Sequence, residues 1–151
     1  RGISALSALV ALKACTVVRR RRAKVGMRPV ARSDDLELLD LPAGAEGGVI
    51  RYFRGEAYGV DLSLLCVEIL PGHGAPPHTH TYDELFVIHG GRGRYTIGEE
   101  SLEAGAGDVV VVPVGAPHGF VSVGDEALRQ TSVHRNAVFA QTLLSPNAET
   151  G

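Results

Sequence analysis

The stretch that decides the fold is Gly72-His73-Gly74-Ala75-Pro76-Pro77-His78-Thr79-His80-Thr81-Tyr82-Asp83-Glu84. Side chains of an extended chain alternate between two faces, so His78 and His80 project to the same side. Pro76 and Pro77 fix φ and favour extended geometry around them. Glu84 follows His80 by an even step and can point inward after a slight turn. The stretch therefore places two imidazoles and a carboxylate on one face.

Downstream lies a second stretch, Gly107-Asp108-Val109-Val110-Val111-Val112-Pro113-Val114-Gly115-Ala116-Pro117-His118. Its histidine follows a turn marked by proline and glycine. Two imidazoles and a carboxylate leave a divalent ion short of a full shell, and His118 is the obvious donor to complete it. Such a set suits Fe, Mn, Zn, Cu or Ni, whereas an all-oxygen site would suit Ca or Mg. We therefore expect one divalent transition metal with these ligands: His78, His80, Glu84 and His118.

Together the two stretches resemble the motifs of the cupin superfamily. The first fits the pattern G-x5-H-x-H-x3-E-x6-G at Gly72, His78, His80, Glu84 and Gly91. The second fits G-x5-P-x-G-x2-H at Gly107, Pro113, Gly115 and His118. The second motif often ends in Asn, where this sequence has Ser122, but that Asn is not a metal ligand. The resemblance covers roughly residues 50 to 144, and it implies a small single-domain cupin with a jelly-roll β-barrel.

Composition and turn residues predict a single all-β domain. The 151 residues, 44% of them hydrophobic, suffice for one sizeable core but not for two. The chain has 19 Gly and 8 Pro, which separate short β-branched or alternating segments. The expected strands are 49–54, 61–70, 84–89, 92–97, 108–113, 117–123, 128–134 and 138–144. Such a series of strands predicts a jelly roll or small barrel.

The expected cupin barrel spans 49–145 and is followed by a flexible tail, 146–151. A preceding segment, 27–48, is expected to pack on the barrel. Its leucines are the expected anchors on the outside of the barrel: Leu36, Leu38, Leu39 and Leu41. The run 109–112 is apolar on both faces, which predicts a central strand covered on both sides.

Residues 1–26 differ in charge from the rest of the chain. They carry a charge of +7, whereas residues 27–151 carry −9, and the two give the overall −2. The apolar run 3–18 is interrupted by Lys13 and falls short of the ~20 residues that span a bilayer. The basic cluster follows this run instead of preceding it as in a signal peptide. We therefore expect a non-native or disordered basic leader before a start at Met27.

The same observations bear on partners and location. The alternative for the leader is a nucleic-acid or membrane arm at residues 19–22, but a body at −9 would repel phosphate, so we expect neither partner. Cys15 and Cys66 lie far apart and no C-x-x-C occurs, which favours a reduced, cytoplasmic setting. The expected partner is a small-molecule substrate, and the resemblance implies a homodimer.

Strand parity predicts which side chains flank the metal. Phe86, Ile88 and Phe120 share parity with the ligands on their strands, so they are expected to give apolar surface. Tyr52 and Glu68 are expected at inward positions on earlier strands. No basic residue after the leader lies beside either motif on the ligand-bearing face. This pattern favours a neutral or aromatic substrate over a phosphorylated sugar.

A polar stripe on the segment 128–134 carries the remaining candidates. Gln130, Ser132 and His134 share one face. If this face is outward, His134 is an ordinary exposed histidine; if it is inward, His134 is a base beside the metal or an extra ligand. We expect it to face inward, with His134 as general base or substrate orienter and Gln130 holding the substrate. Without His134, Glu84 or metal-bound water would be the remaining base.

Three classes of function remain open on the residues. The resemblance implies a metal-dependent enzyme, by dioxygenase or oxalate-degrading chemistry or by the chemistry of isomerases and small polyketide cyclases. The alternatives are a non-catalytic module that binds or senses a metabolite, and a storage or structural protein. The same ligands accept iron and zinc, so the sequence leaves redox and non-redox chemistry open. We expect an enzyme, because an open metal shell is needless for storage.

Overall fold

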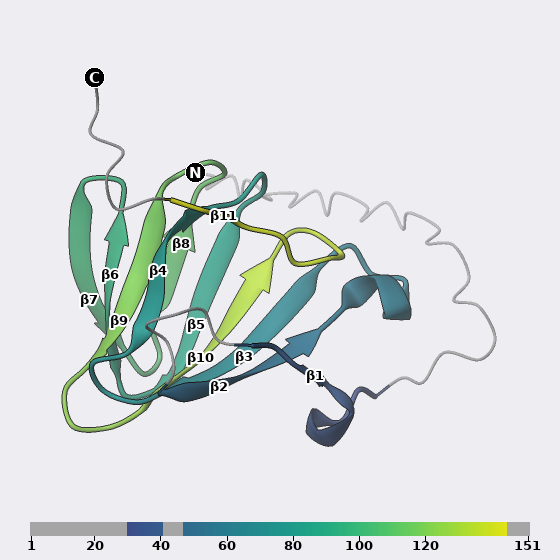
Figure 1. Ribbon diagram of the computed structural model, residues 1–151, viewed down its shortest axis with the longest axis horizontal. Helices are drawn as coiled ribbons and strands as arrows, with labels where there is room; N and C mark the ends of the chain where they lie inside the picture. Colours follow the sequence, from purple (N-terminus) through teal and green to yellow (C-terminus); the bar gives the residue numbers. More distant parts are fainter. Residues whose placement is uncertain (1–29, 41–46, 145–151) are drawn as a thin grey trace, which may run out of the picture.

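A computed structural model of the protein describes residues 30–40 and 47–144. The described chain forms two antiparallel sheets (Figure 1). The strand order is β1-β2-β3-β10-β5-β8 in the first sheet and β11-β4-β9-β6-β7 in the second. The expected all-β jelly-roll fold is confirmed.

The first sheet contains β1 (Glu37–Leu38), β2 (Gly48–Phe53), β3 (Ser63–Ile69), β5 (Glu84–Gly90), β8 (Val109–Val112) and β10 (Leu128–His134). The second contains β4 (Gly74–Thr79), β6 (Arg92–Ile97), β7 (Glu100–Gly105), β9 (His118–Val123) and β11 (Thr142–Leu143). Two short 3-10 helices are also present: η1 (Ser33–Asp35) and η2 (Gly55–Tyr58).

Period-two alternation builds the core between the sheets. On β5, Glu84, Phe86 and Ile88 are each only 2% exposed, while the residues between them are less buried. The pattern on β10 is the same, so its polar stripe is buried with the core. Tyr95 on β6 is fully buried and packs its ring 5.2 Å from that of Phe86. The sequence parity that predicted inward side chains on β5 and β10 is therefore correct.

Two motif glycines fix turns on which the ligands depend. Gly115 has a φ of 76°, and its N–H donates to the carbonyl of His80 at 2.9 Å, so the turn before His118 is tied to the first stretch. Gly91, between β5 and β6, has a φ of 68°, and a Cβ there would lie 2.4 Å from the carbonyl oxygen of Ala127. Only glycine takes such a conformation without strain.

The structure corrects the prediction of a covered central strand at 109–112. β8 is an edge strand that pairs only with β5 among the described residues. Val109 and Val111 are 54% and 59% exposed, while Val110 and Val112 are buried. A run of four valines cannot distinguish an edge from a centre, because apolar residues on the outer face do not require cover. The homodimer implied by the family resemblance stays a prediction.

Three strands were missed and one was overextended. β4 was expected only as an extended approach; a register irregularity between Ala75 and His78 accommodates its prolines. β7 is an acidic strand that the pattern of apolar residues did not reveal, and β1 has only two residues. Within the expected strand 138–144, only Thr142 and Leu143 pair, with β4.

The predicted leader and tail, 1–26 and 146–151, lie outside the described residues, as does Leu41. Of the expected anchors, Leu38 is 67% exposed because it lies on a short edge strand. Leu39 instead packs against the core. In the part of the chain that the structure describes, no helix has the length and hydropathy needed to cross a membrane. The cytoplasmic location stays a prediction.

Candidate metal centre

Four buried side chains from both sheets converge on one point. His78 lies on β4 and His118 on β9, in the second sheet, while Glu84 begins β5 in the first. His80 lies in the link between β4 and β5. Each is at most 5% exposed, and one donor atom of each lies within 4.8 Å of all the others. The structure thus brings together all four predicted ligands.

Backbone carbonyls hold the rings of these three histidines. Nδ1 of His78 and Nδ1 of His118 each lie 2.8 Å from the carbonyl oxygen two residues earlier. Nδ1 of His80 lies 2.6 Å from the carbonyl oxygen of Ala140. Because a carbonyl oxygen only accepts, each Nδ1 carries the proton and donates it. In the neutral ring, Nε2 then keeps the lone pair that a metal ligand requires.

His78 and His118 reach the same geometry through the same local sequence. Each follows a proline, Pro77 or Pro117, and bonds the carbonyl of the residue before that proline. A proline fixes its own φ and extends the residue before it, so that carbonyl has a defined direction. The two histidines are also paired in register between β4 and β9, with ring centroids 4.2 Å apart. A Pro-His dipeptide on facing strands thus aims two Nε2 atoms at one point.

The contacts of the carboxylate test whether a cation fits this site. Oε2 of Glu84 lies 2.9 Å from Nε2 of His118 and 3.1 Å from Nε2 of His80. Because Nδ1 donates to a carbonyl, Nε2 meets the carboxylate either with a second ring proton, as the hydrogen-bond contact of His118 allows, or with a bound cation between the two atoms. In both cases a positive charge lies among these buried atoms. The donor set therefore fits a divalent transition metal ion.

Burial sets the protonation states of the site. Burial lowers the pKa of His78 from 6.5 to about 4, and the nearby His118 lowers it as well. Burial alone would raise the pKa of Glu84, but three neighbouring histidine rings outweigh it and hold that pKa below its ordinary value. At neutral pH, His78 is therefore uncharged and Glu84 ionised. These are the forms that bind a metal.

A fourth histidine, His134, lies against the same carboxylate but is held differently. It is fully buried on β10, and its Nε2 lies 3.0 Å from Oε1 of Glu84. Its Nδ1 has no hydrogen-bond partner among the described residues. The ring packs edge-on to Phe139, with centroids 4.9 Å apart. His134 therefore faces inward, as the polar stripe predicted, and no backbone carbonyl fixes its tautomer.

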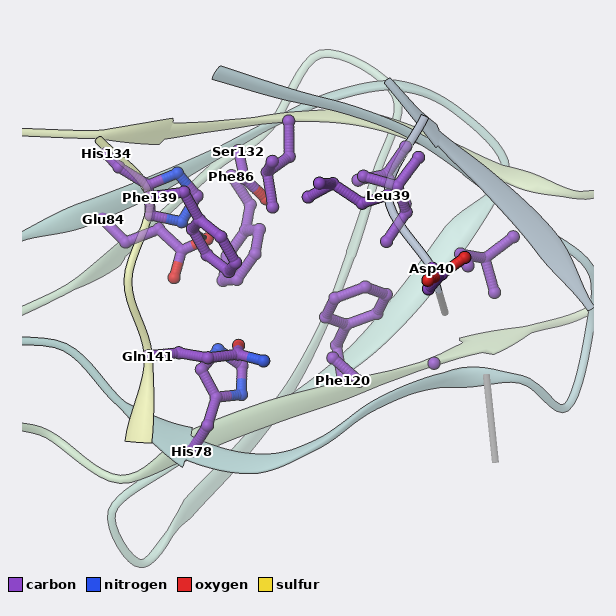
Figure 2. A pocket seen from close by; sticks show the side chains of 16 residues that line it. Leu39, Asp40, His78, Glu84, Phe86, Phe120, Ser132, His134, Phe139 and Gln141 are labelled. Carbon is purple, nitrogen blue, oxygen red and sulfur yellow. Dashed lines mark ion pairs between the residues drawn. The ribbon is translucent and has the colours of Figure 1, made fainter. Parts of the chain in front are cut away.

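A pocket leads to this centre, and Figure 2 shows Glu84, His134 and His78 around one part of it. Aliphatic side chains of β2 and β3 and the rings of Phe86 and Phe120 make most of its wall apolar. No Lys or Arg is among the described residues that line it.

Three of the predicted substrate residues line this pocket: Phe86, Phe120 and Ser132. Tyr52, Ile88 and Gln130 are equally buried but lie outside the lining. The side-chain oxygen of Gln130 accepts a hydrogen bond from the hydroxyl of Tyr95, so Gln130 belongs to the core. Glu68, also expected inward, is exposed because it has the opposite parity on β3.

Tyr52 lies outside the pocket lining but holds the segment 137–141, two residues of which line the pocket. Its hydroxyl accepts a hydrogen bond from the N–H of Phe139 at 2.7 Å. Tyr82 holds the next residue: its hydroxyl donates to the carbonyl of Ala140 at 2.6 Å and accepts from the Ala140 N–H at 2.9 Å. The same carbonyl bonds His80. The segment is thus fastened to a metal ligand.

Among the lining residues that sequence reasoning missed, four lie outside the long strands: Leu39, Asp40, Phe139 and Gln141. All four come from irregular chain beside the barrel, where strand parity gives no information. Interpreting 138–144 as an ordinary strand concealed the last two. One available signal was Phe139 itself, a large aromatic residue five positions after the polar stripe in a chain with only 4 Phe.

Comparison with known proteins bears on the family. Residues 65–134 match the family model of the cupin domain, Cupin_2. The chain contains a cupin domain. An uncharacterized protein of Streptomyces coelicolor is 28% identical to this cupin over 95 residues, 63% of this chain and 85% of that protein. The dimethylsulfoniopropionate lyase DddW of Ruegeria pomeroyi is 39% identical over 74 residues, 49% of this chain and 48% of the lyase.

Solved structures of oxalate decarboxylases share the fold of this cupin. The enzyme of Lactobacillus farciminis is 25% identical with a TM-score of 0.65, over 74% of this chain and 34% of that chain. A Bacillus subtilis oxalate decarboxylase with Mn(II) centres is 21% identical with a TM-score of 0.71, over 85% of this chain and 35% of that one. At 21% identity the likeness shows the fold alone. The cupin spans about a third of these chains and about half of the lyase.

Proposed function

We propose that this cupin is a metal-dependent enzyme that moves a proton at a carbon next to a metal-held oxygen of a small organic molecule. One observation carries the proposal: the four histidines around Glu84 are of two kinds. Three have Nδ1 bonded to a carbonyl and present Nε2 to the centre, whereas Nδ1 of His134 is unpartnered among the described residues. Isomerases, cyclases and lyases need both a metal and a mobile proton.

The metal would be held by the converging donors: His78, His80, Glu84 and His118. When bound, a divalent ion polarises a carbonyl or carboxylate oxygen and stabilises negative charge that develops there. The protein's own contribution is to hold three neutral rings and one carboxylate in place before the ion arrives. The carbonyls behind the rings provide that preorganisation.

The two oxygens of Glu84 serve different neighbours. Oε2 faces the ligand rings of His118 and His80, while Oε1 faces Nε2 of His134. In the tautomer with the ring proton on Nε2, that proton would lie toward Oε1 of Glu84, and the lone pair would stay on Nδ1. That atom is a base that takes a proton without breaking a bond to the backbone. Glu84 itself is the weaker base, because its surroundings lower its pKa.

The pocket wall supports a substrate with an apolar body. Phe86 and Phe120 offer rings, and no Lys or Arg is among the described lining residues to receive a phosphate. Gln141 lines the pocket and takes the role predicted for Gln130 as the amide that orients the substrate. The similarity to a dimethylsulfoniopropionate lyase adds support for elimination, which begins with removal of a proton from carbon.

Dioxygenase chemistry is the second candidate, since three histidines and one glutamate also accept iron. Elemental analysis of the protein purified without added metal separates the two. Iron would favour oxygenase chemistry, and zinc would favour proton transfer without redox change.

The proposed proton transfer can be tested before the natural substrate is known. Pyruvate is a suitable probe, because its oxygens bind metals and its methyl protons exchange with D₂O after deprotonation. Zinc-loaded protein should accelerate this exchange over free zinc, as followed by proton NMR. His134→Gln should lower the rate by about 10²-fold or more while zinc content stays full. The matched control, His89→Gln, changes an exposed histidine on β5 and should leave the rate unchanged.

An unchanged rate in His134→Gln would remove this residue from the mechanism. A wild-type rate no higher than that of free zinc would reject catalysis of proton transfer and favour a metabolite-binding module.

A further inference from the structure

The charged groups that line the pocket lie at two separate places. Figure 2 shows Glu84 and His78 on one side, Asp40 and Leu39 on the other, and the ring of Phe120 between them. Apart from the metal centre and His134, Asp40 is the one charged group among the described lining residues. The pocket is therefore apolar in its middle and charged at both ends.

The backbone places Asp40 at the pocket. The N–H of Leu39 donates to the carbonyl of Ile50 at 3.1 Å, which continues the pairing of β1 with β2 by one residue. The side chain of Leu39 packs against the core. Asp40 follows directly and borders the pocket as an exposed residue, and its carboxylate has no hydrogen bond or ion pair with any described residue. It is an acceptor with no partner from the described protein.

We infer that the substrate carries a cationic group at its end remote from the metal, and that Asp40 receives it. The inference rests on the proposed function, which places an oxygen donor of the substrate at the metal centre. An anionic group at the remote end would be repelled by Asp40. A neutral apolar group would cover the carboxylate without replacing its hydration. A cation is attracted to the carboxylate and also to an aromatic ring face such as that of Phe120.

The metal centre has the opposite charge. Three neutral rings and one carboxylate around a divalent ion leave a net charge of about +1. The two ends of the pocket therefore match a molecule with an anionic or carbonyl oxygen at one end, a short apolar spacer, and a quaternary ammonium, sulfonium or protonated amine at the other. With an anionic oxygen such a molecule is a zwitterion, which has no net charge but two charged ends.

Two isosteric probes test this inference on the zinc-loaded full chain. One is trimethylammonio-butanoate, and the other is the same acid with carbon in place of nitrogen, which has equal shape and no cation. Calorimetric titration should show roughly tenfold tighter binding of the ammonium probe. Asp40→Asn should abolish that preference. Asp125→Asn, which changes an exposed carboxylate between β9 and β10, should retain it.

The possible results separate the inference from the proposed function. Equal affinities of the wild type for both probes, or binding of neither, would overturn the inference, as would a preference that survives Asp40→Asn. The proposed function is judged independently, by zinc content and by the pyruvate exchange rate, because pyruvate has no remote group to reach Asp40.

Discussion

Histidine rings lie on two sides of one carboxylate and differ in how their second nitrogen is held. On the Oε2 side of Glu84, His80 and His118 are each fixed by a carbonyl at Nδ1, as is His78 beside them. On the Oε1 side, His134 is equally buried and equally close, but its Nδ1 is free among the described residues. Burial and distance to the carboxylate are alike, so they cannot distinguish a ligand from a base.

What distinguishes the two kinds of histidine is the partner of Nδ1, the ring nitrogen that does not face Glu84. A ring whose Nδ1–H is committed to a carbonyl has one tautomer and a permanent lone pair at Nε2, which suits a metal. A ring with an uncommitted nitrogen can gain and lose a proton at low cost, which suits catalysis. Substitutions of the two kinds of histidine should therefore differ in their effect on metal content.

The largest expected effect is loss of the metal from the fixed side. His78→Ala and His118→Ala each remove one of four donors, and the remaining buried rings and carboxylate do not form a full shell. Both variants should lose most of their metal after reconstitution and gel filtration, as measured by elemental analysis. His134→Gln, on the other side of Glu84, should keep one ion per chain. Full occupancy in both alanine variants would contradict the assignment of ligands.

A smaller effect concerns the pH dependence of the metal-free protein. The pKa of His78 falls from 6.5 to about 4 on folding, so between these values the unfolded chain binds a proton that the folded one does not. Stability should therefore fall as the pH drops from 6.5 to 4, by at most roughly 3 kcal/mol for this residue. Glu84 acts in the same direction at lower pH, because its pKa is also lowered by folding.

Urea unfolding of the metal-free protein across this pH range measures how much His78 contributes to the change in stability. His78→Gln should flatten the curve between pH 6.5 and 4, whereas His89→Gln should leave it unchanged. Parallel curves for the wild type and His78→Gln would show that His78 is not buried in its neutral form.

The smallest expected effect tests the segment behind the ligands. Tyr82→Phe removes the hydroxyl that bonds Ala140, whose carbonyl also fixes His80. Loss of the hydrogen-bond partner of a metal ligand typically lowers metal affinity 10–100-fold. Tyr82 bonds that partner and not the ligand itself, so we expect metal affinity to fall by less than about tenfold. Competition with a chelator gives the value. Tyr58→Phe is the control, since Tyr58 packs on Phe53 away from the pocket. A loss above a hundredfold would mean that Tyr82 itself holds the metal.

The fold and the four ligands follow from the sequence because local rules govern them. Alternating side chains, proline-stiffened approaches and motif glycines at positive φ all depend on neighbours within a few residues. The inward face of His134 could also be predicted, from parity on one strand. Hydrogen-bond partners decided the rest: Gln130 shares the parity of His134, yet it bonds Tyr95 in the core and does not reach the pocket.

The far end of the pocket could not be predicted, since it is built from irregular chain. Asp40 lies between β1 and β2, and Gln141 lies between β10 and β11; long-range contacts bring both to the pocket. Likewise, the carbonyl that fixes His80 comes from a residue 60 positions later in the chain. The two Pro-His pairs are different, because their carbonyls lie two residues away and are visible in the sequence.

Nitrogen NMR of the zinc-loaded protein, labelled at histidine with ¹⁵N, tests the central comparison most directly. Two-bond spectra report the tautomer and charge of each imidazole, and single His→Gln variants assign the signals. We predict that His78, His80 and His118 hold the Nδ1–H form with Nε2 shifted by the metal, whereas His134 shows no metal shift and holds its proton on Nε2. A metal-shifted nitrogen on His134, or a missing metal shift on any of the other three, would contradict the account.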